Sequence, residues 1–285
     1  MQNKRNLATW LGAVLGIVMA LALNATLAHA ADNDFVKEEF HKTYPLTANG
    51  RFSLQNINGP AHISAWDRNE VKVDAVKRAD DEEGLKNMEI RVDARPESIS
   101  VDTKYLSQED RWNNHRYNHY SSVEYTITVP RNAKLDQVQL INGELDINGV
   151  LGEVRAQCIN GKLVATGLTN RAKLSTVNGM LDAKFDRVPA ESLDLQSVNG
   201  HIQLTLPSDA KVSLDANTVH GGISNEFGLR STHHMVGHEM QGTLGGGGTH
   251  IHLSNVNGAI EIRHANDGRA VSPAKSENGD DEDEI

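Results

Sequence analysis

Residues 154–165 read VRAQCINGKLVA, and residues 172–183 repeat this pattern eighteen residues later as AKLSTVNGMLDA. Both stretches have apolar or small residues at alternate positions, then a β-branched residue, then Asn-Gly, then alternate apolar residues again. A repeat of fixed period is the signature of a solenoid, in which each copy stacks on its neighbour. Because period-two alternation is typical of a strand with one buried face, each copy predicts two short strands that meet at the Asn-Gly corner.

The same corner recurs along most of the chain. Its asparagine position is occupied by Asn58, Asn142, Asn160, Asn178, Asn199, His220 and Asn257. The successive spacings from Asn142 to His220 are eighteen or twenty-one residues. The sequence therefore predicts an all-β, single-domain β-solenoid over residues 48–264, with coils of about 18–21 residues and each corner stacked on the one before it.

An antiparallel β-meander or sandwich is the competing fold, because Asn-Gly between alternating strands is also the strongest short hairpin signal. The repeated identity favours the solenoid, since a meander needs only suitable turns whereas stacked corners need the same residues each time. Stacked asparagines can hydrogen-bond along a ladder, and glycine admits the positive φ of the corner. His220, where asparagine is expected, is predicted to break one contact of this ladder.

The first thirty residues are predicted to be a signal peptide. They contain the cations Lys4 and Arg5, an apolar run at 11–23 that is short of the roughly 20 residues of a membrane span, and the small-x-small sequence Ala28-His29-Ala30. We expect cleavage after Ala30, no transmembrane segment thereafter, and an exported protein of the periplasm or cell surface. Removal of Lys4 and Arg5 would move the formal net charge from -10 to -12.

The remaining segments surround or interrupt the repeat. Residues 31–47 are expected to be a lead-in that caps the fold, and DDEEGLKN at 80–87 a charged loop. Insertions are predicted at 105–120 and at 231–250, the second leaving the coil as a glycine-rich loop. Residues 265–285 end in acidic residues and predict a disordered acidic tail. This acidic balance, without a basic stripe, argues against a nucleic-acid partner.

The order of these motifs resembles a known family. An opening unit FSLQNINGPAHISAW (52–66) and a strand YTITVP (125–130) precede the serial corners LINGELDI, CINGKLVA, TVNGMLDA, SVNGHIQL and NVNGAIEI. This arrangement, over roughly residues 52–263, is similar to the bacterial putative-adhesin domain of unknown function, a toastrack-like β-solenoid of the cell envelope. The resemblance implies a surface or envelope binding role, with relatives that occur beside envelope-stress sensing systems, and it brings no catalytic residues.

The strongest candidate for metal chemistry is the loop 233–252. Its ligand-type residues are His233, His234, Met235, His238, Glu239, Met240, His250 and His252. Histidine and methionine are copper ligands, and histidine with glutamate binds zinc. However, HHMVGHEM is not the HExxH motif, and the surrounding glycines raise the entropic cost of ordering a site. A periplasmic metal-binding protein is therefore an alternative function, and no cofactor or metal ligand is assigned.

Two further sets of residues suggest glycan chemistry. Trp112, His115, Tyr117 and His119 lie in the first insertion, where aromatic rings could stack on sugars, although covering the flank of the solenoid is the favoured interpretation. Asp146, Asp182 and Glu261 each lie four residues after a corner, as carboxylates of a glycan-active solenoid enzyme would. Val164 and Gln203 interrupt that row, so a solvated polar face is favoured.

The sequence as a whole predicts a non-catalytic protein. Cys158, the single cysteine, shares a column with Thr176 and Ser197 and is expected to be a buried thiol. No Ser-His-Asp spacing, phosphate loop or cofactor motif is found, and no catalytic residue is assigned. We expect an exported scaffold, adhesin-like or binding and sensing module, with a cell-envelope protein or glycan as the candidate partner.

Overall fold

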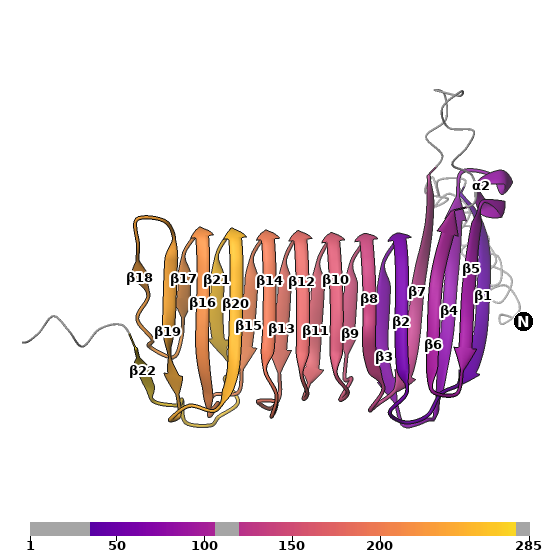
Figure 1. Ribbon diagram of the computed structural model, residues 1–285. Helices are drawn as coiled ribbons and strands as arrows, with labels where there is room; N and C mark the ends of the chain where they lie inside the picture. The colour runs from indigo at the N-terminus through magenta and orange to yellow at the C-terminus, as the bar shows by residue number, and fades with distance from the viewer. Residues whose placement is uncertain (1–34, 106–119, 278–285) are drawn as a thin grey trace, which may run out of the picture. The chain divides into compact units, whose positions relative to one another are not determined.

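The computed structural model describes residues 35–105 and 120–277 (Figure 1). The strands are β1 (Val36–Pro45), β2 (Arg51–Asn58), β3 (Ala61–Trp66), β4 (Glu70–Ala79), β5 (Met88–Arg95), β6 (Ser98–Tyr105), β7 (Ser121–Pro130), β8 (Lys134–Asn142), β9 (Leu145–Asn148), β10 (Val154–Asn160), β11 (Leu163–Leu168), β12 (Ala172–Asn178), β13 (Leu181–Phe185), β14 (Leu193–Asn199), β15 (Ile202–Leu206), β16 (Val212–His220), β17 (Ile223–Asn225), β18 (Thr232–His233), β19 (His238–Leu244), β20 (Thr249–Asn257), β21 (Ile260–His264) and β22 (Ala274–Ser276). The helix is α2 (Glu82–Lys86). Within the described ranges, no helix is long and apolar enough to cross a membrane.

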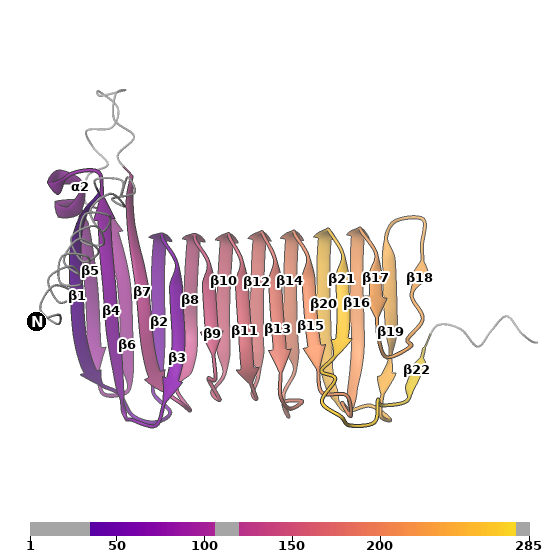
Figure 2. The ribbon, with the colours of Figure 1, turned by 180° about the vertical axis from the view of Figure 1, so that it is seen from behind.

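Two sheets carry the repeat. Sheet A has ten strands in the order β1-β4-β7-β3-β9-β11-β13-β15-β21-β17, and sheet B has the order β18-β19-β16-β20-β14-β12-β10-β8-β2-β6-β5, with β22 paired to β19. At each Asn-Gly corner, the strand before the corner lies in sheet B and the strand after it lies in sheet A (Figures 1 and 2). The two strands that meet at a corner therefore do not form a hairpin.

Equivalent residues of neighbouring coils lie side by side in parallel register. In sheet B, Cys158 pairs with Thr176 and Asn160 with Asn178. In sheet A, Leu163 pairs with Leu181. This pairing confirms the predicted β-solenoid, and the antiparallel alternative is wrong for the repeat. Antiparallel pairs occur instead at the two ends, for example between β4 and β7 and between β16 and β19.

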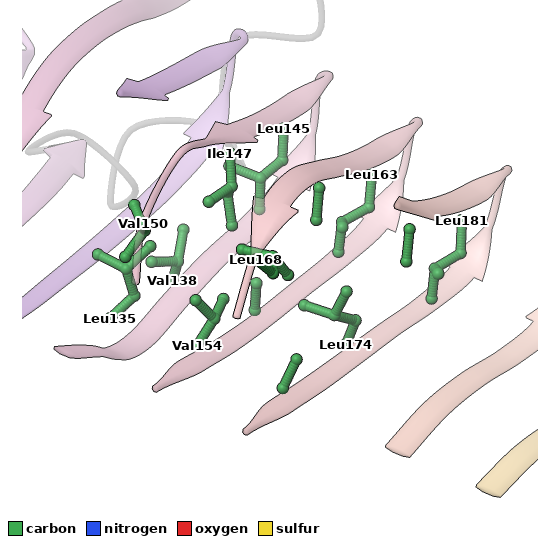
Figure 3. Close-up of a cluster of buried hydrophobic side chains, with 14 of the residues drawn as sticks. Leu135, Val138, Leu145, Ile147, Val150, Val154, Leu163, Leu168, Leu174 and Leu181 are labelled. Carbon is green, nitrogen blue, oxygen red and sulfur yellow. The ribbon is translucent and has the colours of Figure 1, made fainter. Parts of the chain in front are cut away.

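The inward-facing side chains of the two sheets form one apolar core. Figure 3 shows Val154 and Leu174 from sheet B, with Leu163 and Leu181 from sheet A, pointing into the space between the strands. All four side chains are at most 1% exposed. Burial of each contributes roughly 1.5–3 kcal/mol relative to exposure, so the alternate apolar residues are what hold the two sheets together.

The first Asn-Gly unit stacks directly on the coil of Asn142, although it precedes that coil by 84 residues. Strand β2 pairs in parallel with β8, and β3 pairs in parallel with β9. Beyond this unit, β6 and β5 extend sheet B while β7, β4 and β1 extend sheet A. The predicted lead-in is thus an edge strand from Val36 onward, and residues 31–34 lie outside the described residues.

The predicted loop at 80–87 is wrong, because residues 82–86 form helix α2. Asp81 caps this helix by accepting a hydrogen bond from the Gly84 backbone N–H at 2.7 Å. Glu82 and Glu83 lie in the first turn and Lys86 in the last, which suits the helix dipole. The acidic run that suggested a solvated loop is therefore a helix start.

The coils do not stack in the order of the sequence at the other end. Strand β20 lies between β14 and β16, so Asn257 pairs with both Asn199 and His220. Likewise β21 lies between β15 and β17. The coil that comes last in the sequence, that of Asn257, thus lies between the coils of Asn199 and His220. The expectation that each corner stacks on the preceding one is wrong here.

The second predicted insertion and the tail are more ordered than expected. Within 231–250, β18 and β19 form antiparallel strands that cover the edge of β16, so this segment does not leave the coil as a loop. Residues 265–277 are not a disordered tail, since β22 pairs with β19. Residues 278–285, which contain most of the predicted acidic end, lie outside the described residues.

Candidate binding surface

The Asn-Gly corners are packed so tightly that a side chain does not fit at the glycine. Gly161 has φ +153°, and a Cβ there would overlap the carbonyl oxygen of Gly143 in the neighbouring coil. Gly179 stands in the same relation to Gly161, and Gly200 to Gly179. Glycine is therefore required at these corners by the close approach of the next coil, and at Gly161 and Gly179 also by the backbone conformation.

Asparagine side chains form a continuous ladder beside these glycines. The amide of Asn142 donates to Asn58 at 2.8 Å, and the same bond links Asn160 to Asn142, Asn178 to Asn160, Asn199 to Asn178 (3.0 Å) and Asn257 to Asn199. His220, which replaces asparagine, lies beyond Asn257 at the end of the ladder. The contact predicted to be lost at His220 falls at the end of the ladder, because among the described residues no side-chain hydrogen bond joins His220 to Asn257, while the six asparagines are joined without interruption.

One step before each corner asparagine, and before His220 in the same position, an aliphatic side chain points out of sheet B. We call this set the aliphatic column; in spatial order it consists of Ile57, Ile141, Ile159, Val177, Val198, Val256 and Val219. Ile141, Val198, Val219 and Val256 are 38–40% exposed, and the other three are half-buried. All seven coils thus place a β-branched aliphatic residue at an outward position. Strands about 4.8 Å apart set these side chains in contact range of one another along the sheet.

A polar row runs beside the aliphatic column, two positions closer to the start of each strand. It consists of Gln55, Gln139, Gln157, Ser175, Gln196, Ser254 and Asn217. Ser254 Oγ donates to Asn217 Oδ1 at 3.0 Å, and Gln196 donates to Asp194 at 2.9 Å. The row therefore presents amide and hydroxyl groups at strand spacing, next to an aliphatic edge.

Charged residues lie on the far side of the polar row and are mostly paired with each other. Lys173 contacts Asp194 at 3.1 Å, and His252 contacts Asp215 at 3.4 Å. A shallow groove of about 370 Å³ runs over this part of the sheet, lined by Asp136, Gln137, Val138, Gln139, Arg155, Ala156, Gln157, Lys173 and Ser175. The outer face of sheet B is thus a banded surface of aliphatic, amide and charged rows.

At the start of this face, a second groove of about 310 Å³ adjoins Tyr105. It is lined by Gln55, Asn56, Ile57, Asp102, Thr103, Lys104, Tyr105, Gln139 and Ile141. Tyr105 ends β6 where the first predicted insertion begins, and burial raises the pKa of its hydroxyl. The candidate aromatic residues Trp112, His115, Tyr117 and His119 lie outside the described residues. The insertion therefore starts at the edge of this surface.

The structure separates the histidines of the candidate metal loop 233–252 into two groups. His233 and His238 are cross-strand partners with ring centroids 4.6 Å apart, while His234 contacts Glu239 at 3.3 Å. His250 and His252 lie on β20, two strands away from β19 in sheet B. Met240 is buried, and its sulfur accepts a hydrogen bond from the Asn225 amide. In the described part of the chain, no three His, Cys, Asp or Glu side chains are placed to share a metal ion.

The carboxylates considered for glycan chemistry lie on the outer face of sheet A, on alternate strands. Asp146 pairs with Val164, which pairs with Asp182, and Gln203 separates Asp182 from Glu261. Two strand spacings put neighbouring carboxylates roughly 10 Å apart, beyond the range of a glycosidase pair. Asp146 contacts His62 at 2.7 Å, and Glu261 contacts Arg263 at 2.8 Å. Asp146 and Glu261 are thus members of surface ion pairs.

Cys158 occupies the predicted column and is fully buried. Its thiol donates to the carbonyl oxygen of Gly143 at 3.2 Å. Burial raises the pKa of the Cys158 thiol to about 11. The predicted buried thiol is therefore confirmed.

The aliphatic column is the feature that sequence reasoning did not connect with binding. Its signal was present, since a β-branched residue precedes every corner. Period-two alternation places this β-branched residue on the outward face of its strand. Outward positions of such strands are usually polar, so an aliphatic residue at the same outward position in every coil is unusual.

Comparison with known proteins gives a family match over part of the chain. Residues 137–263 match the family described as Toastrack DUF4097, which confirms the resemblance found in the sequence. No curated protein matches the chain. Among solved structures, a putative cell adhesion protein from Clostridium sporogenes has a TM-score of 0.45 and 13% identity, with 81% of this chain and 100% of that chain covered. A putative adhesin from Bacteroides fragilis has a TM-score of 0.28 and 10% identity, covering 80% of this chain and 97% of that one.

Proposed function

We propose that this chain, whose residues 137–263 match the Toastrack DUF4097 family, is an exported, non-catalytic binding module of the bacterial cell envelope. The outer face of sheet B is its binding surface, and the aliphatic column is the observation that carries the proposal. Seven outward aliphatic side chains in register form an extended apolar strip with a polar row along one side. Apolar strips of this length that face solvent mark sites of interaction.

The chemistry of this face favours a protein partner over a glycan. The column and the row consist of aliphatic, amide and hydroxyl groups, whereas sugar rings are bound by stacking on aromatic faces. An apolar core with polar groups at its rim is the usual composition of a protein interface. The partner is therefore an envelope protein that lays an apolar surface along the column.

Export is supported by the sequence of the first thirty residues, which has the charge, apolar run and small-x-small site of a signal peptide. Determination of the N-terminus of the protein recovered from envelope and periplasmic fractions tests this part. A terminus at Ala31 is expected. A protein that keeps Met1 in the cytoplasmic fraction would contradict the export proposal without bearing on the binding surface.

The binding surface is tested by adding charge to the column. Val198 and Val256 are neighbours, since the strands that carry them pair in register, and both are exposed. The double variant Val198→Asp with Val256→Asp should lose retention on isolated envelope fractions, because two carboxylates would have to be desolvated in the interface. The matched control is Ser64→Asp with Thr128→Asp, two outward residues paired across β3 and β7 on sheet A, which should bind like wild type.

Treatment of the envelope fraction identifies the partner class. Protease treatment should abolish retention of the wild-type protein, and digestion of cell-wall glycan should leave it unchanged. Equal retention of the column variant and wild type, with unchanged urea midpoints for all variants, would refute the column as the binding surface. Loss of retention after glycan digestion alone would replace the protein partner with a glycan.

A further inference from the structure

The hairpin between β18 and β19 holds two histidines side by side at the end of sheet B. His233 and His238 form the last pair before the turn, and their ring centroids are 4.6 Å apart at an interplanar angle of 42°. The His234 backbone N–H donates to the Gly237 carbonyl at 3.1 Å and closes the turn. The backbone positions of both histidines are therefore set by the strand pairing and by the hydrogen bond that closes the turn.

The turn is also held against the body of the sheet. Gly237 has φ +87°, and a Cβ there would overlap the carbonyl oxygen of Thr218 on β16. The next residue, His238, pairs with Thr218 in the antiparallel register of β19 and β16. A histidine pair that rests on a neighbouring strand loses less entropy on binding a ligand than the same pair in a free loop.

We propose that His233 and His238, with Met235 between them, form a binding site for monovalent copper. A metal held by two imidazole nitrogens at about 2.0 Å each needs those nitrogens within about 4 Å of each other. Rings with centroids 4.6 Å apart reach that separation by rotation about their side-chain bonds. Met235 is fully exposed in the turn, so its thioether is free to close over the pair as a third ligand.

The composition of the site selects a soft metal. Imidazole and thioether ligands suit Cu(I), whereas Zn²⁺ prefers four ligands that include thiolate, imidazole or carboxylate groups. The nearby carboxylate, Glu239, contacts His234 at 3.3 Å and pairs with Asn217, so it lies on the opposite face of β19 from His238. Residues paired directly across antiparallel strands share a face, and successive residues alternate.

The other histidines of this region belong to a different surface. His250 and His252 point outward from β20, where His252 contacts Asp215 at 3.4 Å. His238 is instead on the side of the buried Thr218. The site is therefore expected to bind one metal ion per chain, and His252 provides a matched control.

The test is a titration of the exported form of the protein with Cu(I), in competition with a chromophoric Cu(I) chelator, and with Ag(I) as a redox-inert probe. One saturable site is expected. His233→Asn or His238→Asn should each weaken binding by about tenfold or more, since even partners outside the coordination sphere contribute that much to metal affinity. Met235→Leu should weaken Cu(I) and Ag(I) binding while leaving any weak Zn²⁺ binding unchanged.

His252→Asn and Cys158→Ser are the controls and should bind like wild type, the latter because the single thiol is buried. Each variant is also checked by circular dichroism and urea unfolding, because these hairpin residues are exposed or half-buried and their replacement should leave the fold intact. The proposal is overturned by absence of a saturable Cu(I) site. It is equally overturned if affinity is unchanged in both histidine variants, or if Met235→Leu does not distinguish Cu(I) from Zn²⁺.

Discussion

Replacement of Gly200 by alanine tests whether close stacking of corners, rather than backbone conformation, is what requires glycine. Unlike Gly161 and Gly179, Gly200 does not have a φ in the left-handed region, so alanine brings no intrinsic backbone strain there. A Cβ at Gly200 would nevertheless overlap the carbonyl oxygen of Gly179 in the adjacent coil. The two strands must move apart at this corner for the new methyl group to fit.

The size of the effect follows from the bonds that meet at this corner. The Gly200 N–H donates to Asn257 at 3.0 Å, its carbonyl accepts from the buried Asn255 amide at 2.7 Å, and the Gly179 N–H donates to the Asn199 carbonyl at 3.0 Å. Overpacking in a close-packed region costs about 1–3 kcal/mol. Weakening one or two hydrogen bonds adds about 0.5–1.5 kcal/mol each. Gly200→Ala should therefore destabilise the protein by about 1.5–6 kcal/mol.

Urea unfolding followed by circular dichroism measures this difference. Gly222→Ala is the matched control, because a Cβ at Gly222 meets nothing within 4 Å and its φ is also outside the left-handed region. The control should unfold within about 0.5 kcal/mol of wild type, as surface substitutions usually do. If Gly200→Ala is as stable as Gly222→Ala, the stacking explanation is refuted.

Three further substitutions or treatments test the corner and the core. Asn178→Ala removes two exposed hydrogen bonds of the ladder and should lower the free energy of unfolding in urea by about 1–2 kcal/mol. A decrease of less than about 0.3 kcal/mol would show that the ladder does not contribute to stability. Cys158, whose thiol pKa is raised to about 11 by burial, should not react with a disulfide reagent at pH 8 until the protein unfolds, and rapid labelling of the native protein would contradict that burial. Tyr125→Phe leaves the buried Thr103 hydroxyl without its 2.8 Å partner and should cost about 1–3 kcal/mol, whereas a neutral effect would mean that Thr103 finds another partner.

The stacking of the central coils was predictable because each position in the repeat has the same structural role in every coil. Val154 and Leu163 are buried because the alternation is strict, and Asn160 and Gly161 are fixed because a neighbouring coil presents the same groups. Such a pattern gives the register as well as the fold, since a shift by one residue would expose every buried side chain.

The ends were less predictable because their strands lack this repetition. Helix α2 has only five residues, and its signal is a capping aspartate followed by two glutamates, which is also the composition of a solvated loop. The segment at 238–244 became strand β19 because it covers the otherwise open edge of β16. Protection of an exposed edge depends on which strand is terminal, and that is a property of the assembled fold.

The reversed order of the last two coils follows from the ladder itself. A coil inside the ladder must both donate and accept a side-chain amide hydrogen bond. The amide of Asn257 can do both. A histidine has one donor and one acceptor, but their spacing across the ring does not fit the same geometry. If the coil of His220 lay directly on Asn199, the ladder would be cut at that level. Placing the coil of Asn257 between them extends the ladder by one hydrogen bond and leaves His220 at the terminal level, where only one neighbouring corner has to be matched. The substitution that looked like a defect in the sequence thus marks the coil at which the ladder ends.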